Sequence, residues 1–86
     1  MRDPSPIRIE SISHPNLLIE FSDASLRRFS VESLLNYPFF EPLKNPHLFG
    51  QARIAHRTIT WPGDIDIAPE MLWIDSVPVN AATPAQ

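Results

Sequence analysis

The side chains of this chain that could do chemistry begin with a small acidic group. Asp64 and Asp66 stand two residues apart, so in a strand both carboxylates point to one side, where with Glu70 they could hold Mg²⁺ or Ca²⁺. Two or three carboxylates are fewer ligands than calcium needs, and if Ile65 and Ile67 face a core the acids simply face water. We therefore expect no metal and no cofactor.

Histidines and serines are the next candidates, for nucleophilic catalysis. The histidines are His14, His47 and His56. The serines that could pair with them are Ser22, Ser25 and Ser33. No histidine pair has ligand spacing on one helix, no nucleophile-elbow sequence is present, and so short a chain offers little cleft to exclude water. We expect the histidines on the surface and predict no catalytic residues and no enzyme activity.

The composition excludes several classes of protein. Ten Asp+Glu stand against seven Lys+Arg, a formal charge of −3 in 86 residues. A nucleic-acid binder needs a basic face, so direct nucleic-acid binding is not expected. The absence of cysteine removes disulfides, thiolate metal sites and cysteine nucleophiles. The N-terminus lacks a signal-peptide pattern and no apolar run is long enough to span a bilayer, which predicts a cytoplasmic protein without a membrane partner.

Two arginines and three aromatic residues are the candidates for partner binding. Arg27 and Arg28 could form a basic patch with Arg8 and Arg53, but neighbouring residues of a strand face opposite sides, so both can join it only if the strand bulges. The favoured interpretation is a solvated pair that protects a sheet edge, still open to an acidic partner surface. Tyr37 and Phe39 flank a proline in a loop, and Trp73 lies at the expected domain edge. In so small a domain most aromatic residues are expected to belong to the core. If these side chains are exposed instead, they would mark a protein interface, because Tyr and Trp dominate contact hot spots.

The elements that must position these residues are short. Alternating apolar residues predict strands, and ten prolines against two glycines make long helices improbable. The third strand, with apolar residues three apart, is expected either to bulge or to leave the sheet early toward a helix. The expected strands are 7–10, 17–21, 26–29, 53–55, 58–61 and 64–67. The expected short helices are 31–35, capped by Ser30, then 46–49 and 69–73. The fold class is α+β: one small, hairpin-built antiparallel sheet of about five or six short strands with two or three short helices.

The domain organisation is simple. Residues 1–5 are expected to be a flexible leader, and residues 6–75 a single domain. Residues 76–86 carry no charge and two prolines, which predicts a tail that is disordered or orders only on a partner.

The order of these pieces resembles the bacterial family catalogued as domain of unknown function 2442. The family pattern F-x-P-L-x-D-P-x-x-F stands here as FEPLKNPHLF, residues 40–49. The pattern W-P-N-G-x-D-L-x-P-x-x-L stands as WPGDIDIAPEML, residues 61–72, with Gly63–Asp64 in place of Asn-Gly. The match spans about residues 6–73. The motif residues are Phe40, Pro42, Leu43, Pro46, Phe49, Trp61, Pro62, Asp66, Pro69 and Leu72.

The resemblance implies an α+β domain with no established catalytic residues. Many relatives are encoded beside a second small family, domain of unknown function 4160, in what look like toxin–antitoxin pairs, and some carry a helix-turn-helix segment. We expect a non-enzymatic protein-interaction module, an antitoxin-like partner of a small basic toxin-like protein; a homodimer would also suit the thin core. The alternative is a ligand-sensing regulatory domain without that DNA-binding segment, which a pocket lined by Phe39, Phe49 and Trp61 would favour.

Overall fold

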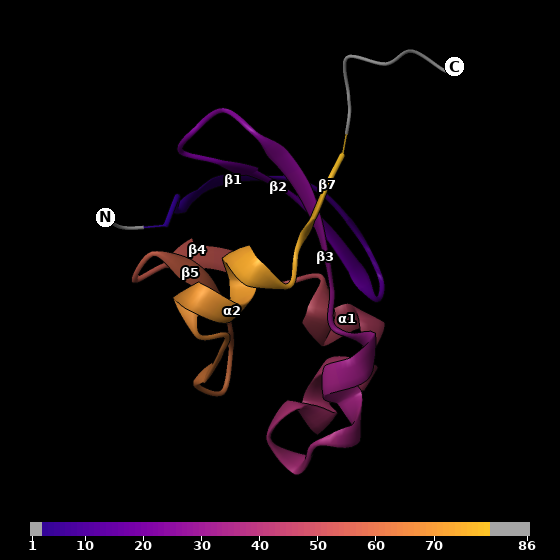
Figure 1. Cartoon of the computed structure of the whole chain (residues 1–86). Helices are drawn as coiled ribbons and strands as arrows, with labels where there is room; N and C mark the ends of the chain where they lie inside the picture. The colour runs from indigo at the N-terminus through magenta and orange to yellow at the C-terminus, as the bar shows by residue number, and fades with distance from the viewer. Residues whose placement is uncertain (1–2, 80–86) are drawn as a thin grey trace.

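The computed structural model describes residues 3–79 as two antiparallel sheets with short helical segments, shown in Figure 1. The α+β class is confirmed at this level. The expectation of one sheet with five or six strands is wrong, because the described strands number seven and form a four-stranded and a three-stranded sheet. The ends of the predicted leader and tail, residues 1–2 and 80–86, lie outside the described residues.

The four-stranded sheet has the order β1-β2-β3-β7. Its strands are β1 (Pro6–Ser13), β2 (Asn16–Phe21), β3 (Leu26–Ser30) and β7 (Val77–Pro78). Alternation in β2 places Leu17, Ile19 and Phe21 on one fully buried face. The other face of this sheet is open to solvent, as antiparallel sheets allow. Because β7 lies within residues 76–86, the predicted tail began too early.

Strand β3 pairs with β2 in continuous register, so of the two alternatives for this strand the bulge is wrong. The strand ends at Ser30, and the chain passes through Val31 into the helical segment that begins at Glu32. The register irregularities lie instead in β1, between Pro6 and Arg8 and between Ile9 and Ser11. The apolar residues of β3 do not alternate because Arg27 occupies a position on the core side of the strand, opposite Ile19. A guanidinium with partners of its own can occupy that position without a shift in register.

The three-stranded sheet consists of β4 (Arg53–Ala55), β5 (Thr58–Trp61) and β6 (Ile65–Asp66). His56 and Arg57 join β4 to β5 with φ values of 54° and 69°, the turn geometry that matches the twist of a hairpin. The predicted strand 64–67 is shorter, because Asp64 has φ 62° and belongs to the preceding turn. Asp64 and Asp66 therefore do not share one strand face.

A helical arm, residues 32–49, connects the two sheets and extends away from the four-stranded sheet (Figure 1). It contains the 3₁₀ helices η1 (Glu32–Asn36) and η2 (Pro38–Lys44) and the short helix α1 (Pro46–Phe49). Prolines lack the N–H that a continuous α-helix needs, which explains the short 3₁₀ pieces. Asn45 caps α1 by accepting a 2.9 Å hydrogen bond from the His47 N–H.

One buried core takes residues from both sheets, from the helical arm and from helix α2 (Pro69–Ile74). In the described part of the chain, no helix is long and apolar enough to cross a membrane. The buried apolar residues are Leu17, Ile19, Phe21, Phe29, Val31, Leu43, Phe49, Ile59, Trp61, Ile65, Ile67 and Leu72.

Candidate interaction surface

Tyr37 and Phe39 form an exposed pair, here called the aromatic tip, at the junction of η1 and η2. Their side chains are 60% and 54% exposed. Phe40 packs edge-on against Phe39, with ring centroids 4.9 Å apart, and is itself half-buried against the core. Leu43, one turn further, is fully buried. The buried side of η2 thus anchors the segment while the aromatic tip faces solvent.

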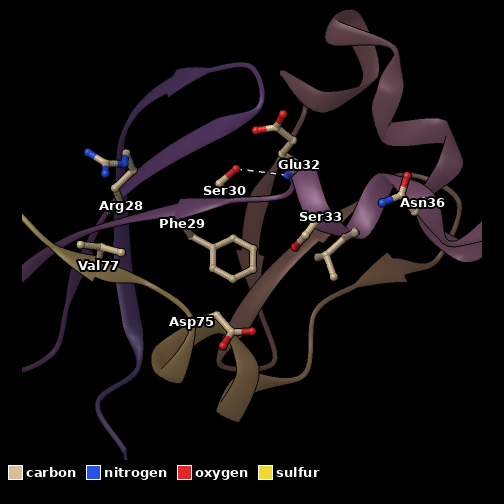
Figure 2. Close-up of a pocket in the computed structure, with 9 residues that line it drawn as sticks. Arg28, Phe29, Ser30, Glu32, Ser33, Asn36, Asp75 and Val77 are labelled. Carbon is tan, nitrogen blue, oxygen red and sulfur yellow. Dashed lines mark hydrogen bonds between the residues drawn. The ribbon is translucent and has the colours of Figure 1, made fainter.

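An open pocket of about 640 Å³ lies where β3, η1 and the segment from α2 to β7 meet. Figure 2 shows Phe29 at its centre, with side chains from the three segments around it. We call it the β3 pocket. Its lining residues are Arg28, Phe29, Ser30, Glu32, Ser33, Leu34, Asn36, Asp75 and Val77.

The β3 pocket combines apolar and charged groups. Arg28, Glu32 and Asp75 are all exposed, and none of the ion pairs found within residues 3–79 uses them. The hydroxyl of Ser30 accepts a 3.1 Å hydrogen bond from the N–H of Glu32. The predicted cap at Ser30 is nevertheless wrong, because η1 begins one residue later than expected, with Val31 as its N-cap and no side-chain cap hydrogen bond. One cation and two carboxylates leave the pocket with a net negative charge.

A smaller pocket of about 190 Å³ lies beside Tyr37 of the aromatic tip. Asn36 of η1 lines both this pocket and the β3 pocket. The lining residues of the smaller pocket are Leu35, Asn36, Tyr37, Pro38, Glu41 and Lys44.

Arg27, predicted as a partner-binding residue, is engaged inside the protein. Its guanidinium lies 4.1 Å from the ring centroid of Trp73 and donates hydrogen bonds to the hydroxyl (2.6 Å) and carbonyl (2.8 Å) of Ser76. Trp73 in turn packs edge-on against Phe21. We call Arg27, Trp73 and Ser76 the Arg27 clamp. Two of the five predicted partner-binding residues, Arg27 and Trp73, thus make contacts within the protein. The other three are Arg28, Tyr37 and Phe39, which are exposed.

Ser76 and His14 have structural roles that the sequence analysis missed. Ser76 was placed in the tail, but it is buried beneath Arg27. His14 lies at the surface as expected, yet its Nε2 is 2.9 Å from the backbone carbonyl of Leu43 and its ring packs edge-on against Phe49. No sequence signal marks either contact, because each joins positions at least 29 residues apart.

The motif residues divide into buried anchors and turn residues. Phe49 and Trp61 stack with ring centroids 5.8 Å apart, and Trp61 Nε1 donates a 3.0 Å hydrogen bond to the Phe49 carbonyl. Leu43 and Leu72 are also buried, and Phe40 is half-buried. Of the motif prolines, Pro46 and Pro69 begin α1 and α2, Pro42 lies inside η2 and Pro62 lies in a turn, whereas Asp66 is exposed in β6. The exposed members are Pro42, Pro46, Pro62, Asp66 and Pro69.

The pocket expected for a ligand sensor does not form from Phe39, Phe49 and Trp61. Phe49 and Trp61 stack on each other inside the core, whereas Phe39 is exposed on the aromatic tip. Trp61 instead borders an open hollow of about 510 Å³ between the turns of the three-stranded sheet, with Asp64 and Asp66. Within residues 3–79 no group of three acidic or histidine side chains could hold a metal ion.

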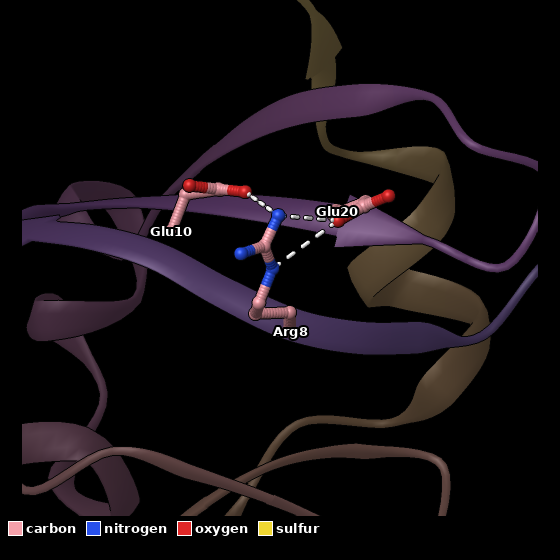
Figure 3. A network of polar contacts seen from close by, with 3 residues as sticks. All are labelled: Arg8, Glu10 and Glu20. Carbon is pink, nitrogen blue, oxygen red and sulfur yellow. Dashed lines mark hydrogen bonds and ion pairs between the residues drawn. The ribbon is translucent and has the colours of Figure 1, made fainter.

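An ion-pair network lies on the solvent face of the four-stranded sheet, away from the β3 pocket. Figure 3 shows Arg8 between Glu10 and Glu20. Arg8 donates hydrogen bonds of 2.9 Å and 3.3 Å to Glu20, and these bonds, with the charge of Glu10, raise the pKa of Arg8. In the β2–β3 turn, hydrogen bonds from the Ser25 hydroxyl and N–H lower the pKa of Asp23. Both sites are exposed and belong to the scaffold.

Comparison with known proteins gives one match. The family model described as Protein of unknown function (DUF2442) matches residues 7–76, which is most of the chain and includes both motif patterns. No curated protein and no solved structure matches the chain.

Proposed function

The chain belongs to the DUF2442 family, and from that premise we propose that it is a non-enzymatic, cytoplasmic protein-interaction module. The partner we propose is a small basic protein, which the chain would block in the manner of an antitoxin. A member of the second family, domain of unknown function 4160, is the first candidate for this partner.

The observation that carries the proposal is the aromatic tip. Large aromatic side chains are costly to leave in water, and Tyr in particular is enriched in the hot spots of interfaces. Tyr37 and Phe39 flank Pro38 and are more than half exposed, and the segment that carries them is anchored by Phe40 and Leu43. A surface of this kind needs little ordering on binding, so most of its contact energy is available to a partner.

Electrostatics supports a basic partner. The chain carries a net charge of −3, and the β3 pocket contains two carboxylates and one guanidinium. Opposite charge on the partner would speed the encounter and orient it. The interaction is therefore expected to weaken as salt increases.

The test is affinity purification of the tagged full chain from its native cells, followed by mass spectrometry. We expect one small basic protein near stoichiometry, retained less at high salt. The double variant Tyr37→Ser/Phe39→Ser should lose about tenfold or more of that protein. Ile7→Ser is the matched control, because Ile7 is 56% exposed on β1, at the opposite edge of the sheet from β7. Equal recovery with both variants, or recovery of the chain alone, would count against the proposal.

A ligand-sensing regulatory domain is the second candidate. The β3 pocket has a volume within the range of small-molecule sites, which favours it, although most such sites are more enclosed and apolar. This role predicts that a small metabolite raises the melting temperature of the purified chain in the absence of any protein. A protein partner recovered through the aromatic tip would instead support the first proposal.

A further inference from the structure

The β3 pocket is the place where a β-ladder stops before its strand ends. Strand β7 pairs with β3 only at Arg28–Val77 and Arg27–Pro78, and Val79 adds a 2.8 Å hydrogen bond from its N–H to the Leu26 carbonyl. Strand β3, however, continues to Ser30. Among residues 3–79, no strand lies beside Ser30 on the β7 side.

The backbone of Ser30 faces this gap. In antiparallel pairing, alternate residues direct both their N–H and C=O to the same neighbour. The Leu26 carbonyl points to β7, so Arg28 and Ser30 point to that side as well. The next residue, Val31, donates its N–H to Pro15 on the opposite side, which agrees with this alternation. The N–H and C=O of Ser30 are therefore directed into the β3 pocket.

The chain itself cannot fill the gap from the direction of α2. Continuing the register from Arg28–Val77 would place Asp75 opposite Ser30. Asp75 is the C-cap of α2, and its N–H is bonded to the Met71 carbonyl at 2.9 Å. The helix thus takes the backbone group that would extend the ladder.

The outer edge of β7 is a poor alternative for an added strand. By the same alternation, Pro78 is the residue that faces away from β3, and proline has no N–H to donate. The pocket beside Ser30 differs, because it has an unpaired strand end, apolar walls at Leu34 and Val77, and room for a chain.

We propose that the β3 pocket binds an extended segment of the protein partner, which adds to β3 at Ser30 and places a basic side chain between Glu32 and Asp75. This inference rests on the proposed function and deepens it by stating the chemistry of the partner. Main-chain hydrogen bonds would supply affinity, and the pocket walls and charges would supply specificity. The aromatic tip would contact the folded part of the same partner, since Asn36 lines both the β3 pocket and the smaller pocket beside Tyr37.

The test uses the purified, ¹⁵N-labelled full chain and a synthetic probe, acetyl-Thr-Lys-Val-Lys-Thr-amide. We expect saturable shifts of the amide signals of Ser30, Ser33 and Val77, and slower hydrogen exchange at Ser30. Asp75→Lys should weaken binding and raise the dissociation constant of the probe about fivefold or more. Glu70→Lys, the same reversal of charge on the exposed first turn of α2, is the matched control and should leave the dissociation constant nearly unchanged.

Three results would overturn the inference. They are equal binding of the acidic counterpart acetyl-Thr-Glu-Val-Glu-Thr-amide, equal weakening by Glu70→Lys, and the absence of saturable shifts. A Ser30 amide already protected in the free chain would also contradict it, because a further segment of this chain or a second copy would then occupy the gap. The double variant Tyr37→Ser/Phe39→Ser should bind the probe as the unchanged chain does. The proposal for the β3 pocket and the proposal for the aromatic tip can therefore fail independently of each other.

Discussion

The indole of Trp61 stacks on the phenyl ring of Phe49 and donates a 3.0 Å hydrogen bond to its backbone carbonyl. The two residues come from the two separate motif patterns, so this contact joins the helical arm to the three-stranded sheet. The arm carries the aromatic tip, and the position of the tip relative to the sheets therefore depends on a buried contact far from it in sequence.

Trp61→Phe removes the indole donor while it retains an aromatic ring. The Phe49 carbonyl would keep only the longer 3.3 Å hydrogen bond from the Ala52 N–H, so we expect a loss of about 0.5–1.5 kcal/mol in the free energy of unfolding. Urea denaturation measures it, with the exposed Tyr37→Phe as the control expected to be neutral. An unchanged midpoint for Trp61→Phe would mean that the hydrogen bond contributes nothing to stability.

Phe40→Ala separates the anchor of η2 from the core. A fully buried phenylalanine such as Phe49 should cost about 3–5 kcal/mol when truncated to alanine. Phe40 is only half-buried, so its loss should be smaller, about 1–3 kcal/mol. Denaturant melts of the two variants side by side would check the order, and a larger loss for Phe40→Ala would contradict the observed packing.

Arg27→Lys tests the Arg27 clamp with the charge retained. Lysine cannot reproduce the forked hydrogen bonds to Ser76 together with the stacking on Trp73, so we expect about 1–2 kcal/mol of destabilisation. Hydrogen exchange at the Val79 amide, which bonds to Leu26, should accelerate as β7 loosens. Arg28→Lys on the exposed face is the control. Slow exchange at Val79 in both variants would show that β7 holds without the clamp.

Local patterns in the sequence were sufficient for most of the secondary structure. Alternation located β2 and the hairpin β4–β5, and prolines located the starts of α1 and α2. The division into two sheets was not predictable, because which hairpin pairs with which depends on long-range packing. The role of Arg27 was not predictable from the sequence for a related reason. A charged residue on a core face breaks the apolar period, and only the distant partners Trp73 and Ser76 explain it.

The candidate site was predictable only in part. Tyr37 and Phe39 were predicted to bind a partner only if they are exposed, and a core position was favoured for most aromatic residues; both side chains are in fact exposed. The β3 pocket was missed, because its walls come from three segments and its key feature is a backbone group at Ser30. Backbone hydrogen-bonding capacity leaves no mark on residue type. The nearest sequence signal for the β3 pocket was the end of the third predicted strand, directly before Ser30.

Ser25→Ala should change the titration of Asp23. The hydroxyl and N–H of Ser25 favour the ionised carboxylate, so the pKa of Asp23 lies below its ordinary value of 3.8. This interaction contributes stability above the ordinary pKa, and the contribution is lost as the pH falls through the lowered pKa of the folded state. In the variant, an NMR titration of the carboxyl carbon should show the pKa of Asp23 moving up. Ser33→Ala is the control, and an unchanged Asp23 pKa in Ser25→Ala would contradict the assigned cause.

The most direct test of the interaction role replaces Phe39 with the photoreactive residue benzoylphenylalanine in cells. Illumination should produce one dominant adduct whose second component is a small basic protein, because the aromatic tip would lie within the interface. The same residue at the exposed position of Ile7, on the far edge of the sheet, should give little of that adduct. Equal adducts at both positions, or none at Phe39, would contradict a partner bound through the aromatic tip.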